Sequence, residues 1–229
     1  MVLPNFFQNA NEQRIASYDF TDLASGTGLE RFYAATVISG GLLYVLTPNQ
    51  IYSDAVVLSS GTLTNISTAA FVAQEYNFDS SEFNLPRTVN GKMDLLIPWG
   101  VIGQTSATDN DTIYHLITLK KLQGSTETNI SNVKTGERTY GPIDTQIKTF
   151  LEPCVMEVPQ TNIKKGEQLR INLKQYARSG LAANGSRKLF IGVDPQNRLL
   201  NRNDGQNYLS SGQFDTSTMF YDIPFKIVL

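Results

Sequence analysis

Apolar and polar residues alternate along most of this sequence with the two-residue period of a β-strand. Residues 113–120 place Ile113, His115 and Ile117 on one face, and residues 169–174 alternate strictly between apolar and polar. Further runs with strand character lie at 32–38, 42–46, 51–58, 71–78, 93–97, 127–133, 143–158, 189–193 and 219–229. Helical periodicity is not sustained over any long stretch, so the pattern predicts an all-β protein.

Turn residues separate these runs and suggest how they connect. Ser39-Gly40-Gly41 predicts a hairpin between the first two strands, Gly124-Ser125 predicts a second hairpin, and residues 164–167 predict a third turn. Pro98 is expected to end the strand at 93–97, and residues 71–78 are expected to form an edge strand. The fold predicted is a two-sheet antiparallel sandwich of the jelly-roll type, formed by residues 29–229 as one domain.

The first 28 residues lack a strand or helix period and differ from the rest of the chain. Asn and Gln residues are mixed there with Phe6, Phe7, Tyr18 and Phe20. A polar segment that carries a few aromatic side chains suits attachment to a neighbouring subunit. We therefore predict an extended N-terminal arm at 1–28, with these four aromatic residues in protein interaction.

Charge and hydropathy narrow the classes of partner. Lys and Arg number 19 against 21 Asp and Glu, which leaves a net charge of −2 and no basic block for nucleic acid. The sequence contains neither an apolar run long enough to span a membrane nor a typical signal peptide. We therefore expect synthesis in the cytoplasm, with no nucleic-acid partner and no membrane partner.

Few residues suit catalysis. Cys154 and His115 are the only residues of their types, and the G-x-S-x-G motif of serine hydrolases is missing. Glycoside hydrolysis needs two facing carboxylates, for which Asp94, Glu127 and Glu75 are the main strand candidates. The sequence therefore leads us to expect a protein that is not an enzyme and that uses no cofactor.

One polar loop has the oxygen ligands that calcium prefers. Its candidate ligands are Asp194, Asn197, Asn203 and Asp204, followed by Gly205. Their order does not match an EF-hand, and the closing Glu is missing. Asx-rich turns are far commoner than calcium loops, so no metal site is predicted.

Four stretches resemble capsid-associated jelly-roll proteins of tailed bacteriophages. They are Tyr18-Asp19-Phe20-Thr21-Asp22-Leu23-Ala24-Ser25-Gly26-Thr27-Gly28, Phe83-Asn84-Leu85-Pro86-Arg87-Thr88, Leu119-Lys120-Lys121-Leu122-Gln123-Gly124-Ser125-Thr126-Glu127-Thr128 and Asp222-Ile223-Pro224-Phe225-Lys226-Ile227. The resemblance implies a decoration, minor capsid or connector protein without a cofactor. It assigns no functional residue, because such proteins act through whole surfaces.

We therefore expect a virion structural protein, a decoration or minor capsid subunit made in the host cytoplasm. It would bind neighbouring particle proteins, such as a major capsid protein, through its surface and N-terminal arm, as a homo-oligomer and most simply a trimer. One alternative is a tail or collar protein. A carbohydrate-binding, receptor-binding or lectin-like module would need an exposed aromatic platform, for which Trp99, Tyr208 and Tyr221 are candidates. A polysaccharide-active enzyme would use Asp94 or Glu127.

Overall fold

The computed structural model describes residues 16–17, 27–64, 68–103, 111–140, 148–179, 186–198 and 216–226. Within these ranges every regular element is a β-strand, which confirms the all-β prediction, and no helix there could cross a membrane. The strands are β1 (Ala16–Ser17), β2 (Thr27–Ile38), β3 (Leu42–Thr47), β4 (Val57–Ser59), β5 (Leu63–Thr64), β6 (Phe71–Ser80), β7 (Arg87–Gly103), β8 (Asp111–Gln123), β9 (Thr126–Lys134), β10 (Arg138–Tyr140), β11 (Lys148–Ile163), β12 (Gln168–Ser179), β13 (Ser186–Gly192) and β14 (Phe220–Lys226).

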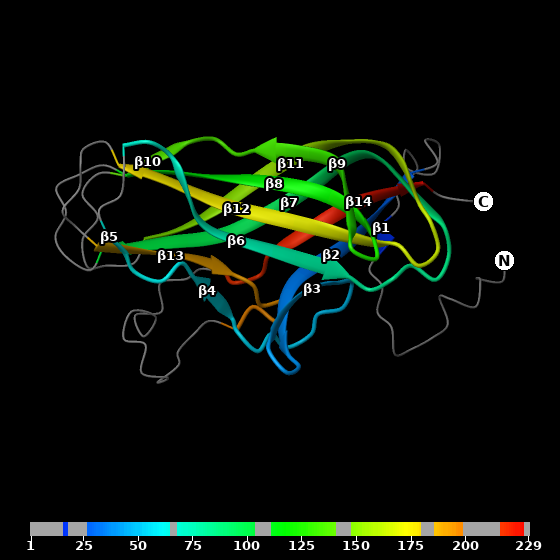
Figure 1. Cartoon of the computed structure of the whole chain (residues 1–229), viewed down its shortest axis with the longest axis horizontal. Helices are drawn as coiled ribbons and strands as arrows, with labels where there is room; N and C mark the ends of the chain where they lie inside the picture. Colours follow the sequence, from blue (N-terminus) through cyan, green and yellow to red (C-terminus); the bar gives the residue numbers. More distant parts are fainter. Residues whose placement is uncertain are drawn as a thin grey trace.

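The described strands form one connected sheet, in the order β10-β8-β12-β6-β3-β2-β14-β7-β13-β4 (Figure 1). Four more strands pair at its sides, β1 with β2, β11 with β7, β5 with β13 and β9 with β8. The pairings are antiparallel except for β3 with β6, which join in parallel through two residues each. The architecture is thus one large, mostly antiparallel sheet. The finer prediction, a jelly-roll sandwich of two separate sheets, is not confirmed.

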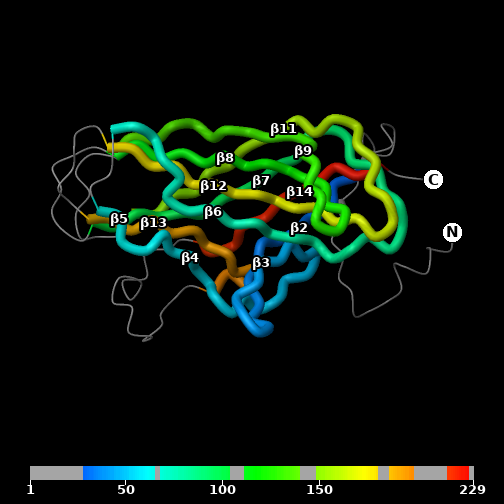
Figure 2. Tube along the Cα trace, viewed as in Figure 1, coloured from blue at the N-terminus to red at the C-terminus, as the bar shows by residue number. Residues whose placement is uncertain are grey.

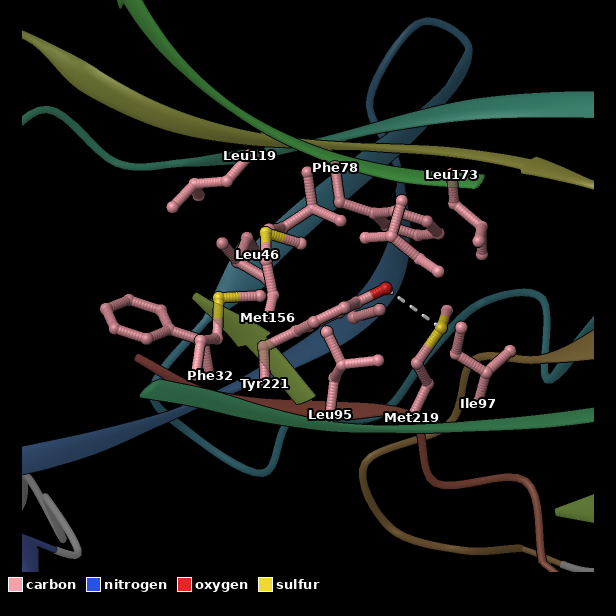
Figure 3. Close-up of a cluster of buried hydrophobic side chains, with 14 of the residues drawn as sticks. Phe32, Leu46, Phe78, Leu95, Ile97, Leu119, Met156, Leu173, Met219 and Tyr221 are labelled. Atoms are coloured by element: carbon pink, nitrogen blue, oxygen red, sulfur yellow. Dashed lines mark hydrogen bonds between the residues drawn. The ribbon is translucent and has the colours of Figure 1, made fainter. Parts of the chain in front are cut away.

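The sheet folds over so that two of its stretches face each other. In Figure 1, β6, β8 and β12 cross in front of β2, β7 and β14. Figure 3 shows the core between them, where Phe78, Leu119 and Leu173 face Tyr221 and Leu95. These side chains are almost fully buried, and burial of such apolar surface is the main force that stabilises the fold.

Strand β7 is longer than the sequence predicted, because Pro98 does not end it. The strand pairs with β11 along one edge, where Pro98 lies opposite Leu151. Along the other edge it pairs with β14 up to Leu96 and with β13 from Trp99. Pro98 therefore lies where one neighbour ends and the next begins, and a missing N–H costs least at such a gap.

The predicted strand at 51–58 is also wrong, since only β4 is regular there. The Thr36 amide donates to the Ser53 hydroxyl, and that hydroxyl donates to the Val193 carbonyl at 2.6 Å. The Asp54 amide donates to the Thr36 carbonyl. Contacts between polar side chains and the backbone thus replace a strand ladder in this segment. The strand predicted at 71–78 is confirmed as β6, but its predicted place at the edge is wrong, because β6 lies inside the sheet between β12 and β3.

Other local predictions are confirmed. Hairpins form at the two predicted turns, where Gly40 and Gly124 have φ angles of 69° and 57° that favour glycine. On β8 the residues predicted to share one face, Ile113, His115 and Ile117, are all buried, as is Leu119.

The structure describes two parts of the predicted arm. Ala16 and Ser17 form β1, which pairs antiparallel with β2 at Glu30 and Leu29, and Thr27 already belongs to β2. Phe6, Phe7, Tyr18 and Phe20 lie outside the described residues. The arm and its aromatic contacts therefore stay a prediction.

Candidate binding groove

The hairpin of β2 and β3 projects from the body of the sheet (Figure 2). It carries exposed apolar side chains. The exposed fractions of Ile38, Leu42 and Leu43 are 68%, 40% and 49%. The Ser39 amide donates to the Gly41 carbonyl at 2.9 Å, which closes the tip. Neighbouring apolar residues exposed in this way typically mark an interaction site.

A hollow of about 600 Å³ opens beside this hairpin, where β3 separates from β6. The two strands pair only at Val45 with Asp79 and at Leu46 with Ser80, so the outer edge of residues 42–44 has no described strand beside it. Apolar residues of β2 and β3 form one wall, and polar residues of β6 form the other. The lining comprises Val37, Leu42, Leu43, Tyr44, Val45, Leu46, Thr47, Pro48, Ile51, Asn77, Asp79, Ser80, Ser81 and Gln168.

A second hollow of about 380 Å³ continues from the first, since Pro48, Ser80 and Ser81 line both. Its other residues are Glu30, Phe32, Glu82, Phe83, Asn84, Leu85 and Arg87. Arg87 forms an ion pair with Glu30, and its guanidinium lies 4.1 Å from the ring centre of Phe225. The two hollows together are called the junction groove below.

The polar wall of the junction groove is held by ion pairs. Arg170 donates two hydrogen bonds of 2.5 Å to Asp79 and also pairs with Glu127. Lys120 donates to Glu127 at 2.7 Å, and this hydrogen bond is the main reason that the pKa of Glu127 lies below its usual value. Of the other candidate carboxylates, Asp94 is exposed on β7 and Glu75 lies on β6, and neither strand pairs with β9. The structure therefore does not assemble the proposed glycosidase pair.

His115 lies inside the core at the start of a chain of buried polar side chains. Its Nε2 lies 3.0 Å from the Gln175 amide nitrogen, and Gln175 accepts a hydrogen bond from Gln74. Gln74 in turn accepts one from the Tyr76 hydroxyl at 2.8 Å. The Trp99 ring packs edge-on at 5.3 Å between centroids. Burial lowers the pKa of His115 to about 3, so its imidazole is neutral in the folded protein near pH 7.

We expect that His115 makes the protein less stable in acid. Because the pKa is about 3 in the folded state and about 6.5 when unfolded, the unfolded chain takes up a proton between these values that the folded chain does not. As the pH drops through this window, the free energy of unfolding should decrease by about 1.4 kcal/mol per pH unit. His115→Gln should remove that slope in urea titrations at pH 4–7, while equal slopes in both proteins would contradict it.

The polar loop uses its candidate calcium ligands for other contacts. Asp194 is fully buried, and its Oδ2 accepts hydrogen bonds from the Arg198 backbone amide and side chain at 2.8 and 2.9 Å. The Asn197 side-chain oxygen accepts from Thr216 and Ser217. Both residues therefore stabilise a turn instead of facing a cation. Asn203 and Asp204 lie outside the described residues, among which no cluster of His, Cys, Asp and Glu could hold a metal ion.

Two of the three aromatic residues considered for a carbohydrate-binding platform are buried. Trp99 and Tyr221 are at most 1% exposed, and Tyr208 falls outside the described part of the chain. Cys154 is half-buried on β11, and burial raises the pKa of its thiol, which disfavours the reactive thiolate. These two residues and Cys154 therefore give no binding platform and no activated nucleophile.

The sequence did not reveal the junction groove. Residues 32–38 and 42–46 were predicted only as the two strands of a hairpin, with no prediction of which side chains are exposed. The lack of alternation towards the hairpin tip was the one available signal, since a strand that faces both core and solvent alternates. The groove itself depends on β6, which is distant in sequence and could not be placed beforehand.

No protein-family model matches this chain, and no curated protein matches it. Solved structures do match. An α-amino acid ester hydrolase aligns with a TM-score of 0.53 and 10% identity, over 85% of this chain and 36% of the hydrolase. A CocE/NonD family hydrolase from Staphylococcus aureus aligns over the same shares, with a TM-score of 0.46 and 11% identity. A structure of infectious bursal disease virus, Gx strain, has a TM-score of 0.23 and 10% identity, over 100% of this chain and 59% of that one.

The match to the α-amino acid ester hydrolase corrects the expectation that the protein is not an enzyme. The ester hydrolase shares the fold, and this chain spans about a third (36%) of its length. The exclusion rested on missing local motifs and on a single histidine. Catalytic groups come together from distant parts of a fold in many sequence orders, so a missing motif does not exclude catalysis. The exclusion of enzymatic activity is therefore wrong.

Proposed function

We propose that this chain is a structural protein of a virus particle, which binds neighbouring particle proteins through the β2–β3 hairpin and the junction groove. One observation carries the proposal: Ile38, Leu42 and Leu43 are exposed together beside an apolar hollow of about 600 Å³. Apolar patches bordered by polar residues favour protein contacts. The virion assignment is supported by the resemblance of four sequence stretches to phage capsid-associated proteins.

Within this proposal the folded-over sheet is a variant of the jelly-roll sandwich. Its two facing stretches support this description. The role is that of a head decoration or minor capsid subunit, as a homo-oligomer in contact with a major capsid protein. A tail or collar position and a carbohydrate-binding module remain the alternatives within the proposal.

The particle assignment is tested on density-purified virus particles from the source of the sequence. Peptide mass spectrometry should detect the chain in fixed ratio to the capsid, and immunogold should label the heads. Gold at the neck or tail would favour the tail or collar role. A chain missing from the particles would overturn the proposal and make glycan arrays the next measurement.

The binding surface is tested with a hairpin variant, Leu42→Ser/Leu43→Ser, supplied during infection. We expect its incorporation into particles to fall by at least about tenfold, because each leucine would contribute on the order of 1 kcal/mol or more at an interface. The control is Leu151→Ser on β11, where a leucine of similar exposure (43%) lies away from the hairpin. Normal incorporation of the hairpin variant, with melting temperatures unchanged, would remove this surface from the proposal.

The likeness to the ester hydrolase supports a second candidate, a β-domain that works within a hydrolase. Such a domain would bind its partner through the same exposed hairpin. Hydrolysis of amino-acid esters by the purified chain, measured alone and with cell extract, distinguishes this candidate from a purely structural role.

A further inference from the structure

The short strand β1 fixes the direction in which the N-terminal segment approaches the sheet. Ala16 lies opposite Glu30 and Ser17 opposite Leu29 on β2. Because this pairing is antiparallel, a chain that leads into Ala16 comes from the direction of higher numbers on β2, which is the direction of the hairpin. Further along the same strand, Tyr33 is already paired with Thr47 of β3.

A segment on this path meets the junction groove. Glu30, opposite Ala16, lines the smaller hollow, and Pro48, just after Thr47, lines both hollows. Because β3 pairs with β2 from Tyr33 onward, the segment cannot continue to pair along that edge of β2. The groove next to it is open. The groove is therefore the nearest surface that an incoming N-terminal segment can follow.

The length of the segment matches the distance along β2 from Glu30 to the hairpin. Seven residues of β2 separate Glu30, opposite Ala16, from Val37, opposite Leu43. Extended chain advances about 3.3 Å per residue, so residues 9–15 could span this distance of roughly 23 Å. Phe6 and Phe7 would then arrive beside the exposed apolar side chains of the hairpin.

The composition of the segment fits the same path. Residues 8–13 are mostly Asn, Gln and Glu, which can form hydrogen bonds with the polar wall at Asn77, Ser80 and Gln168. Arg14 would enter next to Glu82 in the smaller hollow, which gives complementary charge at that end. The two phenylalanines would cover the apolar side chains that the hairpin exposes.

We propose that the junction groove binds this chain's own N-terminal segment, residues 3–14, with Phe6 and Phe7 against Ile38, Leu42 and Leu43. A segment tethered at Ala16 has an effective concentration in the millimolar range, so it outcompetes a second copy at ordinary protein concentrations. The inference deepens the proposed function, on which its biological meaning rests, because a particle protein that binds this surface must displace the segment.

A cross-linking experiment on the full chain tests the docking. The background carries Cys154→Ser, and one cysteine pair is introduced by Asn5→Cys and Ser39→Cys at the hairpin tip. We expect a short bismaleimide to join them within one chain in most molecules at micromolar concentration. The matched control pairs Asn5→Cys with Val155→Cys on β11, where the exposed fraction of 53% gives equal access to the reagent.

Two further measurements separate the possible outcomes. Phe6→Ser/Phe7→Ser should lower the yield of the intrachain product by at least about tenfold, because two buried rings are lost. Mixed isotope-labelled and unlabelled chains report exchange between copies, and a labelled–unlabelled product in place of the intrachain one would overturn the proposal. A yield equal to that of the control pair would overturn it as well. Because the isolated protein is used, failure here is distinct from failure of the particle assignment.

Discussion

Ile171→Asp is expected to lower the free energy of unfolding by at least about 4 kcal/mol. Ile171 is fully buried at the centre of β12, opposite Phe78 on β6 and Leu119 on β8. A carboxylate in this position would be charged without a partner, or would have to take up a proton. Either costs at least about 4 kcal/mol, a large part of the 5–15 kcal/mol that stabilises a typical domain.

The measurement is urea unfolding followed by circular dichroism. Ile171→Val removes one methyl group and should cost only about 1 kcal/mol, which shows that the site tolerates a smaller apolar side chain. Val155→Asp is the matched control, because it puts the same charge on an exposed strand position and should change stability by less than about 1 kcal/mol. A near-neutral result for Ile171→Asp would mean that the inner face of β12 is wrongly assigned.

Arg187→Met should lower the free energy of unfolding by about 3–5 kcal/mol. Arg187 on β13 and Asp111 on β8 form an ion pair in which both side chains are almost completely buried. The two strands are not neighbours in the sheet, so the pair connects its two facing stretches. Removal of the arginine leaves a carboxylate in the interior without this counter-charge.

A double-mutant cycle distinguishes the interaction energy of the ion pair from the cost of leaving one charged partner alone in the interior. Arg187→Met/Asp111→Leu should recover most of the stability lost in Arg187→Met, because an apolar pair of similar size often replaces a buried ion pair at little cost. Additive losses in the double variant would mean that the two residues do not act as a pair. Arg31→Met, which breaks the partly exposed pair with Asp222, is the surface control and should cost about 1 kcal/mol or less.

The strands were predictable wherever one face meets the core and the other meets water. On β12 this contrast gives strict alternation, and Leu169, Ile171 and Leu173 are all buried as expected. Local turn chemistry was equally informative, because Gly40 and Gly124 adopt backbone angles that few other residues tolerate.

Features that depend on distant neighbours were not predictable. Pro98 continues a strand only because β14 ends and β13 begins beside it, and both lie far along the chain. The same holds for the junction groove, which needs β6 next to β3. The ion pair of Arg187 with Asp111 also joins residues with no local signal in common. In each case the deciding contact is tertiary, and no local pattern of residues encodes it.

The place of β14 has a consequence for synthesis on the ribosome. This strand, residues 220–226, lies between β2 and β7 and pairs with both. A growing chain therefore exposes two unpaired strand edges until residues near 226 have left the exit tunnel. Open edges of this kind favour association with other chains, and long-range pairing of this kind folds slowly. Newly made chains should therefore depend on protection during translation, and cells that lack ribosome-associated chaperones should accumulate this protein in aggregates.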